Sequence, residues 1–115
     1  MDVNSTTAKK IQELQVLEQN LQSLFAQKQS VQVELNEVKN ALDELKKSGE
    51  EVYKIISGLM IKSSRESLIK EMEEKNKLFE LRISSIEKQE NIIDKRASEF
   101  RQEITSSLDK SNKKE

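Results

Sequence analysis

Apolar residues recur at alternating spacings of three and four through two long stretches of the chain, and this regularity constrains the fold more than any other feature. The first stretch, residues 8–47, contains neither Pro nor Gly and is rich in Gln, Glu, Leu and Lys, which favour helix. Its repeating positions are Leu14, Leu17, Leu21, Leu24, Lys28, Val31, Leu35, Val38, Leu42 and Leu45. The repeat predicts one long helix, from about residue 7 to 47, that carries a coiled-coil seam. Gly49 is expected to end it in a left-handed cap.

A second stretch with the same spacing is predicted to be helical from about residue 64 to 108. Ser63 and Glu66 have the spacing of a capping box, which marks a helix start. The repeating positions are Ile69, Met72, Asn76, Phe79, Ile83, Ile86, Glu90, Ile93, Ala97, Phe100 and Ile104. If the stretches pair antiparallel, every seam layer is matched, from Leu45 with Ile69 to Leu14 with Phe100. The sequence therefore predicts a helical hairpin within one chain, with pairing between chains as the alternative. Residues 109–115 are polar and are expected to fray.

Between the two stretches, residues 51–62 replace helix formers with β-branched and aromatic side chains. Two short apolar runs flank Ser57-Gly58, which can form a two-residue turn because Gly tolerates positive φ. The expected pairs are Ile56 with Leu59, Ile55 with Met60, Lys54 with Ile61 and Tyr53 with Lys62. We interpret the segment as a β-hairpin; a plain loop or a continuing helix is the alternative.

Both faces of this hairpin are largely apolar, although an isolated two-stranded hairpin is at best marginally stable in water. Its two free edges would also promote aggregation unless they were covered. We therefore expect hairpins from several subunits to pair into a shared sheet or barrel. The residues predicted to make this assembly are Val52, Tyr53, Ile55, Ile56, Gly58, Leu59, Met60 and Ile61.

Composition argues against several other functions. Lys and Arg (20) nearly balance Asp and Glu (21), and the two signs are interleaved, so neither nucleic acid nor a membrane surface is an expected partner. Because the chain contains no Cys and no His, thiolate nucleophiles, catalytic triads and the usual zinc sites are excluded. We expect a protein that is not an enzyme and needs no cofactor. No targeting segment or apolar span is apparent, which predicts a soluble, cytoplasmic protein.

The two seams, the single hairpin at 52–62 between equal arms, and the segments Leu81-Arg82-Ile83 and 86–90 together resemble the β-type subunit of prefoldin. This resemblance covers nearly the whole chain as one domain, residues 1–115. It implies a mainly α fold, with a long antiparallel two-helix coiled coil joined by one β-hairpin. It also implies a hexamer of two α-type and four β-type subunits around a β-barrel body. Such assemblies hold unfolded polypeptides at the arm tips without ATP and deliver them to a group II chaperonin.

The free ends of the two helices carry the residues expected to contact unfolded clients. These are Ile11, Leu14, Val16, Leu17, Phe100, Ile104 and Leu108. Pairing thins out beyond Leu14 and Phe100, where Lys10 faces Ile104, so the ends are expected to expose apolar surface. The alternative is that these residues only widen the coiled-coil stripe or pack at subunit contacts. Phe25, Leu78 and Leu81 lie deeper along the arms, and we assign them to structure. A different function also remains open at this point, namely a structural coiled-coil scaffold that recruits defined helical partners.

Overall fold

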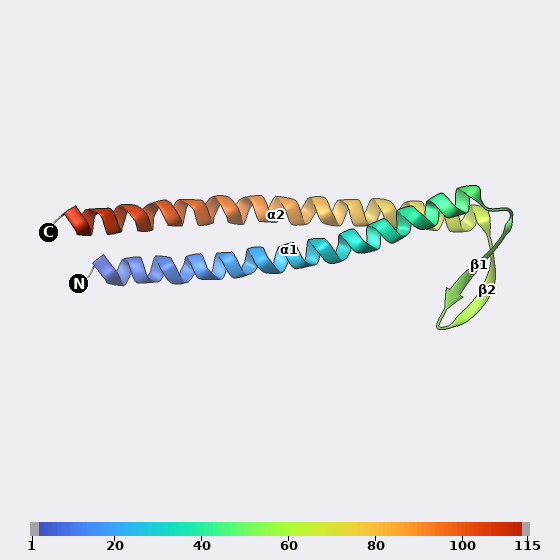
Figure 1. Ribbon diagram of the computed structural model, residues 1–115, viewed down its shortest axis with the longest axis horizontal. Helices are drawn as coiled ribbons and strands as arrows, with labels where there is room; N and C mark the ends of the chain where they lie inside the picture. The colour runs from blue at the N-terminus through green and yellow to red at the C-terminus, as the bar shows by residue number, and fades with distance from the viewer. Residues whose placement is uncertain (1–2, 114–115) are drawn as a thin grey trace. The chain divides into compact units, whose positions relative to one another are not determined.

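The computed structural model describes residues 3–113, in the order helix, strand, strand, helix (Figure 1). Helix α1 spans Val3–Lys47, strand β1 Glu51–Ile56, strand β2 Leu59–Ser64 and helix α2 Arg65–Lys113. The chain divides into two compact units. We call Lys28–Ser84 the hairpin unit, and the residues up to Gln27 together with those from Ser85 onward the terminal unit. In the described part of the chain, neither helix is long and apolar enough to cross a membrane.

Within each unit, segments of α1 and α2 bury the stripe that the repeat predicted. Every seam residue is buried or half-buried, including Leu24, Ile86 and Ala97 in the terminal unit and Leu35 and Val38 in the hairpin unit. Most residues one position away from the seam are exposed. The predicted two-helix coiled coil joined by a hairpin is confirmed.

Two ion pairs in the terminal unit show the antiparallel direction of the helices. The Lys10 ammonium lies 3.2 Å from a Glu103 carboxylate oxygen, and the Arg101 guanidinium lies 3.9 Å from Glu18. Residue numbers rise along α1 as they fall along α2, as the predicted pairing requires. Each pair is substantially exposed, so it contributes little stability and chiefly helps to specify alignment.

Asn76 is a polar residue in the otherwise apolar seam. Its Nδ2 donates a hydrogen bond to Glu80 Oε1 at 3.1 Å on the same helix. Its buried Oδ1 has no hydrogen-bond partner among the described residues. An unsatisfied buried carbonyl costs about 1–3 kcal/mol, and this cost falls in the layer where Asn76 is predicted to meet Val38.

The helices extend further than the sequence predicted. Helix α1 begins at Val3 rather than near Thr7, and α2 continues to Lys113 instead of ending near Leu108. The predicted end of α2 is therefore too early, because polar residues without Pro or Gly weaken a helix but do not end it. Fraying of residues 109–113 stays a prediction. Residues 114 and 115 lie outside the described part. The assignment of all 115 residues to one domain stays a prediction.

Helix α1 ends in side-chain caps and not in a left-handed glycine. The Ser48 amide donates a hydrogen bond to the Glu44 carbonyl oxygen at 2.9 Å, and the Ser48 hydroxyl donates to the Leu45 carbonyl oxygen at 2.9 Å. Gly49 does not have positive φ, so the predicted glycine cap is wrong. The serine hydroxyl satisfies a terminal carbonyl without the left-handed turn that Gly49 would have provided.

Arg65, the first residue of α2, also binds the end of α1. Its Nε donates to the Leu45 carbonyl oxygen at 2.7 Å and its Nη2 to the Lys46 carbonyl oxygen at 3.1 Å. A cation is favourable here because the carbonyls at a helix C-terminus carry partial negative charge. The planar guanidinium thus ties the two helices together on either side of the hairpin.

The hairpin has the predicted register. The antiparallel strand ladder joins Ile56 with Leu59, Ile55 with Met60, Lys54 with Ile61 and Tyr53 with Lys62, then continues through Val52 with Ser63 and Glu51 with Ser64. Ser57 and Gly58 both have positive φ, at 50° and 78°, as a type I′ turn requires. This turn has the twist that suits two antiparallel strands, so the hairpin prediction is confirmed.

Helix α2 starts one residue later than the predicted capping box. The Ser64 hydroxyl accepts a hydrogen bond from the Ser67 amide at 3.3 Å, which makes Ser64 the N-cap. Ser63 and Ser64 both pair in the strand ladder, opposite Val52 and Glu51. Strand β2 therefore runs to Ser64 and α2 begins only at Arg65, so the last strand residue becomes the cap in place of Ser63.

One ion pair fixes the root of the hairpin to α2. The Lys54 ammonium donates a hydrogen bond to Glu71 Oε1 at 2.6 Å, and both side chains are about one-third exposed. Val52 and Leu68 are buried in the same unit. The Lys54 hydrogen bond lowers the pKa of the Glu71 carboxyl below its usual 4.5, although partial burial acts in the opposite direction. The charges of Lys54 and, less strongly, Lys75 lower it further.

Replacing Arg65 should loosen the end of α1. We expect Arg65→Ala to reduce the free energy of unfolding by about 1–2 kcal/mol, because two charge-assisted hydrogen bonds to carbonyls are lost. Urea denaturation followed by circular dichroism, at one fixed protein concentration, measures the change. Arg65→Lys keeps the charge but not the planar fork and should recover only part of the loss. An unchanged midpoint in Arg65→Ala would show that the cap adds no stability.

The Lys54–Glu71 contact should stabilise the hairpin root in a pH-dependent way. Because folding lowers the Glu71 pKa, the stabilisation is fully present above about pH 4.5 and is lost as the pH falls through the lowered value. Carbon NMR titration of the Glu71 carboxyl should give a pKa below 4.5 in the native chain and a higher value in Lys54→Gln. Lys75→Gln is the control and should raise the Glu71 pKa less than Lys54→Gln does. Equal pKa values in the native chain and Lys54→Gln would contradict the assignment.

Candidate functional site

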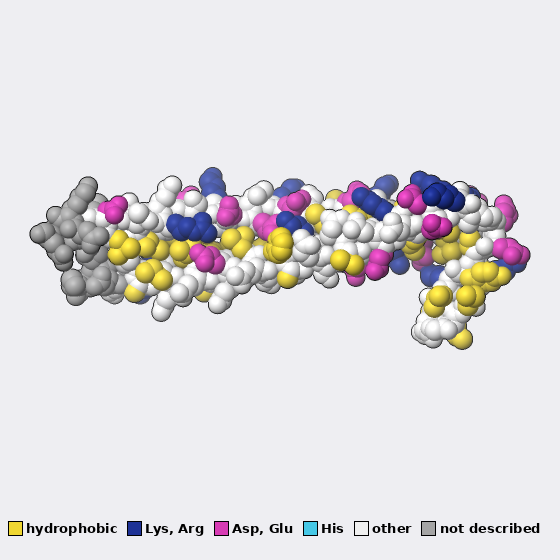
Figure 2. Space-filling model, in the orientation of Figure 1, with side chains coloured by type: hydrophobic (Ala, Val, Ile, Leu, Met, Phe, Trp, Pro, Cys, Tyr) yellow, Lys and Arg dark blue, Asp and Glu magenta, His cyan; other side chains and the backbone are white. Residues whose placement is uncertain are grey.

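The hairpin presents six large apolar side chains to solvent, which we call the hairpin patch. They are between 45% and 71% exposed and are Tyr53, Ile55, Ile56, Leu59, Met60 and Ile61. Figure 2 shows apolar side chains gathered on this hairpin. Such a density of exposed apolar surface on two six-residue strands marks an interaction surface.

The hairpin patch covers both faces of the two-stranded sheet. Ile56, Leu59 and Ile61 lie on one face, whereas the Tyr53, Ile55 and Met60 side chains lie on the other, since strand residues alternate. Of the predicted assembly residues, Val52 is buried at the root and Gly58 forms the turn. The sheet has only these two strands in the described part of the chain, so each has an outer edge that its partner does not cover. Chemically, this arrangement can pair with further strands and bury both faces.

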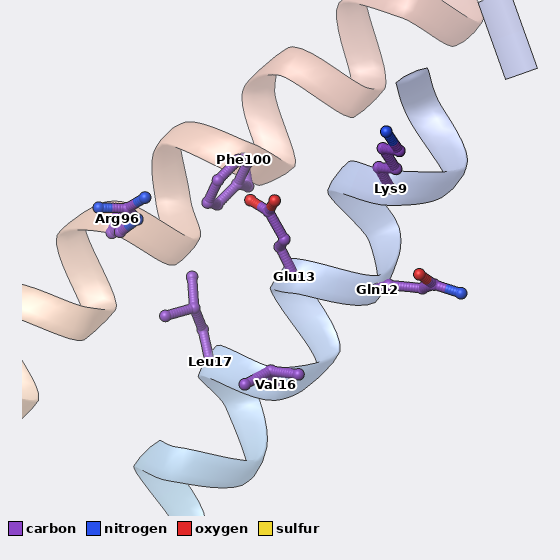
Figure 3. A pocket seen from close by; sticks show the side chains of 7 residues that line it. All are labelled: Lys9, Gln12, Glu13, Val16, Leu17, Arg96 and Phe100. Atoms are coloured by element: carbon purple, nitrogen blue, oxygen red, sulfur yellow. The ribbon is translucent and has the colours of Figure 1, made fainter. Parts of the chain in front are cut away.

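A second surface lies in the terminal unit, where α1 and α2 form an open groove of about 560 Å³ that we call the tip groove (Figure 3). It is lined by Lys9, Gln12, Glu13, Val16, Leu17, Arg96 and Phe100. Leu17 and Phe100 are seam residues whose half-exposed parts form the apolar floor, and Val16 is exposed beside them. The Arg96 guanidinium carbon lies 5.6 Å from the centroid of the Phe100 ring, a cation–π distance.

The structure brings together three of the predicted tip residues, Val16, Leu17 and Phe100, in the tip groove. Ile11 and Leu108 are exposed outside its lining, and Leu14 is half-buried in the seam. Ile104, which was expected to lose its packing, is buried with 9% of its surface exposed. Thr7 is buried as well, so helix pairing in the terminal unit continues past Leu14 and does not thin out there.

Sequence reasoning missed the polar lining of the tip groove. Lys9, Gln12 and Glu13 precede Val16 and Leu17 by about one or two turns, and Arg96 lies one turn before Phe100. The available signal was this spacing, because residues four apart share a helix face. Charged residues are so frequent in the chain, at 36%, that the spacing alone did not single these four out.

Exposed apolar side chains are not confined to the tip groove and the hairpin patch. Phe25, Leu78 and Leu81, to which we assigned a structural role, are exposed in the single chain and so do not widen the buried stripe; Val33 and Ile92 are exposed too. They lie singly or in pairs along the helices. Exposure by itself therefore does not distinguish a binding surface in this chain; the tip groove is distinguished by combining a concave shape with the apolar side chains of Val16, Leu17 and Phe100.

Neither surface has, in the part of the chain that the structure describes, a cluster of side chains that could bind a metal ion. Among the described residues, no three acidic side chains lie close enough together to hold a metal ion. The chemistry that both surfaces support is contact with apolar groups.

The sequence matches the family model for the prefoldin subunit over residues 8–111. The chain is 34% identical to prefoldin subunit beta of Archaeoglobus fulgidus over 100 residues, which cover 85% of this chain and 86% of that protein. It is also 34% identical to prefoldin subunit beta of Methanothrix thermoacetophila over 101 residues, which cover 86% of this chain and 84% of the relative. These matches confirm the resemblance that the hairpin and seams indicated.

Solved structures agree with the sequence relatives. The crystal structure of the prefoldin beta subunit from Thermococcus strain KS-1 matches with a TM-score of 0.84 at 32% identity, covering 90% of this chain and 92% of that one. The beta2 subunit from the same strain shares the fold, with a TM-score of 0.67 at 21% identity over 76% of this chain and 95% of that one. The chain belongs to the prefoldin family, as one of its β-type subunits.

Proposed function

We propose that this chaperone subunit acts in an ATP-independent holdase that binds unfolded polypeptides at its coiled-coil tips and delivers them to a group II chaperonin. Family membership supports the chaperone role, and β-type subunits of the family work in complexes with other prefoldin subunits. The observation that carries the proposal is the hairpin patch, because its apolar faces need a cover that the described residues do not supply. The prefoldin family is one of chaperones and not of enzymes, and we propose no catalytic step.

The hairpin patch is the proposed assembly surface. Pairing its strand edges with hairpins of neighbouring subunits would satisfy unpaired backbone groups and enclose one apolar face in a barrel, while the other face would be left to pack on the outside of the barrel. Fully burying one large apolar side chain contributes about 1.5–3 kcal/mol, so six such side chains per chain supply a large driving force. The proposed partners are further copies of this chain and an α-type subunit, in a hexamer of two α-type and four β-type chains.

The tip groove and the exposed residues near it are the proposed client surface. One shallow groove binds an extended apolar segment weakly, because little area is removed from water. Several arms acting on one unfolded chain raise the overall affinity, since each later contact is intramolecular. Such binding needs no nucleotide, and we propose that it takes place in the cytoplasm.

Assembly should depend on the hairpin patch. Replacing Ile55→Asp together with Ile61→Asp should abolish the oligomer, because the two residues lie on opposite faces of the hairpin and whichever face the barrel encloses would bury an unpaired charge. Both side chains are exposed in the single chain, so helicity should be unchanged. Native mass spectrometry after mixing with an α-type prefoldin subunit measures the assembly, and circular dichroism measures helicity.

The matched control for that experiment is Leu81→Asp with Ile92→Asp. These two side chains are about as exposed as Ile55, but they lie on α2. The control variant should assemble normally. An intact hexamer in the Ile55→Asp, Ile61→Asp variant would refute the barrel role of the hairpin.

Client protection should depend on the tips. Ile11→Ser with Val16→Ser should weaken suppression of aggregation of a denatured protein several-fold, because every arm loses apolar contact and the losses multiply across arms. Light scattering during dilution of the denatured protein measures protection. Val33→Ser with Ile92→Ser removes exposed apolar groups of similar size elsewhere and should protect normally. Equal loss in both variants would mean that the client surface is not restricted to the tips.

A further inference from the structure

The tip groove combines an apolar floor with an excess of positive charge. Leu17 and Phe100 form the floor, Lys9 and Arg96 lie at its borders on the two helices, and Glu13 is the only acidic residue among the described residues of its lining (Figure 3). All three charged side chains are exposed. The lining therefore carries two cations and one anion next to a surface suited to an apolar side chain.

These charges are not engaged by polar contacts within the chain. In the described residues, Lys9 and Glu13 take part in no hydrogen bond or ion pair, and the interaction that Arg96 makes is with the Phe100 ring. Lys10 and Arg101, by contrast, are engaged by Glu103 and Glu18. The cations at the tip groove remain available to an incoming group.

A second surface of the terminal unit has the opposite character. Its described lining residues are Lys10, Glu99, Gln102, Glu103 and Ser106, so among these residues no side chain is apolar and two carboxylates outnumber one cation. Within one unit, apolar surface and excess positive charge thus coincide in the tip groove, while excess negative charge lies on a purely polar surface. A segment that is both apolar and acidic is complementary to the first and repelled by the second.

We propose that the tip groove selects, among unfolded segments, those in which an apolar side chain is flanked by Asp or Glu. The apolar side chain packs on Val16, Leu17 and Phe100, and the flanking carboxylate pairs with the Lys9 ammonium or the Arg96 guanidinium. This inference rests on the proposed client binding at the tips and adds its substrate class. An exposed ion pair contributes about 0.2–1 kcal/mol. This free energy corresponds to an affinity about 1.4- to fivefold higher for an acidic-flanked segment than for a neutral-flanked one at a single tip groove.

The test uses three short peptides with one apolar core, Leu-Phe-Val-Leu, flanked on both sides by two Asp, two Ser or two Lys residues. Because the chain has no cysteine, Gln12→Cys introduces a single attachment point for an environment-sensitive dye at the tip groove. Dye fluorescence of the full-length chain, alone and assembled with an α-type subunit, then gives the dissociation constant of each peptide. We expect the order Asp-flanked, Ser-flanked, Lys-flanked, from tightest to weakest.

Charge variants test whether the named residues cause this order. Lys9→Gln with Arg96→Gln should remove the preference for Asp flanks, whereas Glu13→Gln should increase it. Lys39→Gln with Lys70→Gln gives the same change in net charge from exposed lysines of the hairpin unit and should leave the order unchanged. In about 1 M salt, where the screening length is about 3 Å, the three peptides should converge while the Ser-flanked peptide keeps its affinity.

The outcomes separate this inference from the proposed function. Binding of all three peptides with equal affinity at low salt would overturn the charge selection and leave client binding at the tips intact. Failure of the Ser-flanked peptide to bind, while the chain still protects a denatured protein, would overturn both the tip groove and its selectivity. A preference for Asp flanks that persists in Lys9→Gln with Arg96→Gln would overturn the roles of these two residues.

Discussion

Burial of one apolar stripe on each helix is the interaction on which the rest of this structure depends. A chain with 34% hydrophobic and 36% charged residues cannot build a broad core, but a stripe repeated about every 3.5 residues needs only two helices. Leu35, Val38 and Ile86 are buried in this way although most of their neighbours are exposed. Asn76 leaves a buried oxygen without a partner among the described residues, which is the local cost of a polar residue in an apolar seam.

The hairpin is held by polar contacts at its root and has its apolar residues free beyond it. Arg65 binds the last carbonyls of α1, and Lys54 binds Glu71 on α2, so the strands leave the helices in a defined direction. Both contacts involve a charged group and remain partly accessible to water. Because they are polar, they do not use the apolar side chains of the hairpin, which an apolar contact at the root would occupy. Ile55 and Met60 are consequently left for partners. Preorganisation of this kind lowers the entropy lost when subunits join.

The sequence predicts those features that depend on periodicity and fails on those that depend on local competition. The seam and the Ile56–Leu59 register follow from the coiled-coil and strand periods, and both are observed. Gly49 and Ser63 have the right residue type for caps, yet the Ser48 hydroxyl caps the end of α1 and Ser64, the last residue of β2, caps the start of α2. The sequence predicted the apolar residues of the tip groove, Val16, Leu17 and Phe100, but not its charged residues. Lys9 and Arg96 lie on different helices, and only the pairing of these helices places both charges beside one apolar floor.

The two apolar surfaces differ in a way that suits different partners. The hairpin patch has ordered strands, unpaired edges and fixed side-chain alternation, so it is complementary to a partner of defined geometry. The tip groove is open and shallow, and its charged lining can meet only a side chain and its immediate neighbours. An unfolded polypeptide has no fixed shape to match, but its local sequence persists in every conformation. A surface that selects local sequence is therefore suited to such chains, because several individually weak contacts to one polypeptide add up in affinity and still release readily.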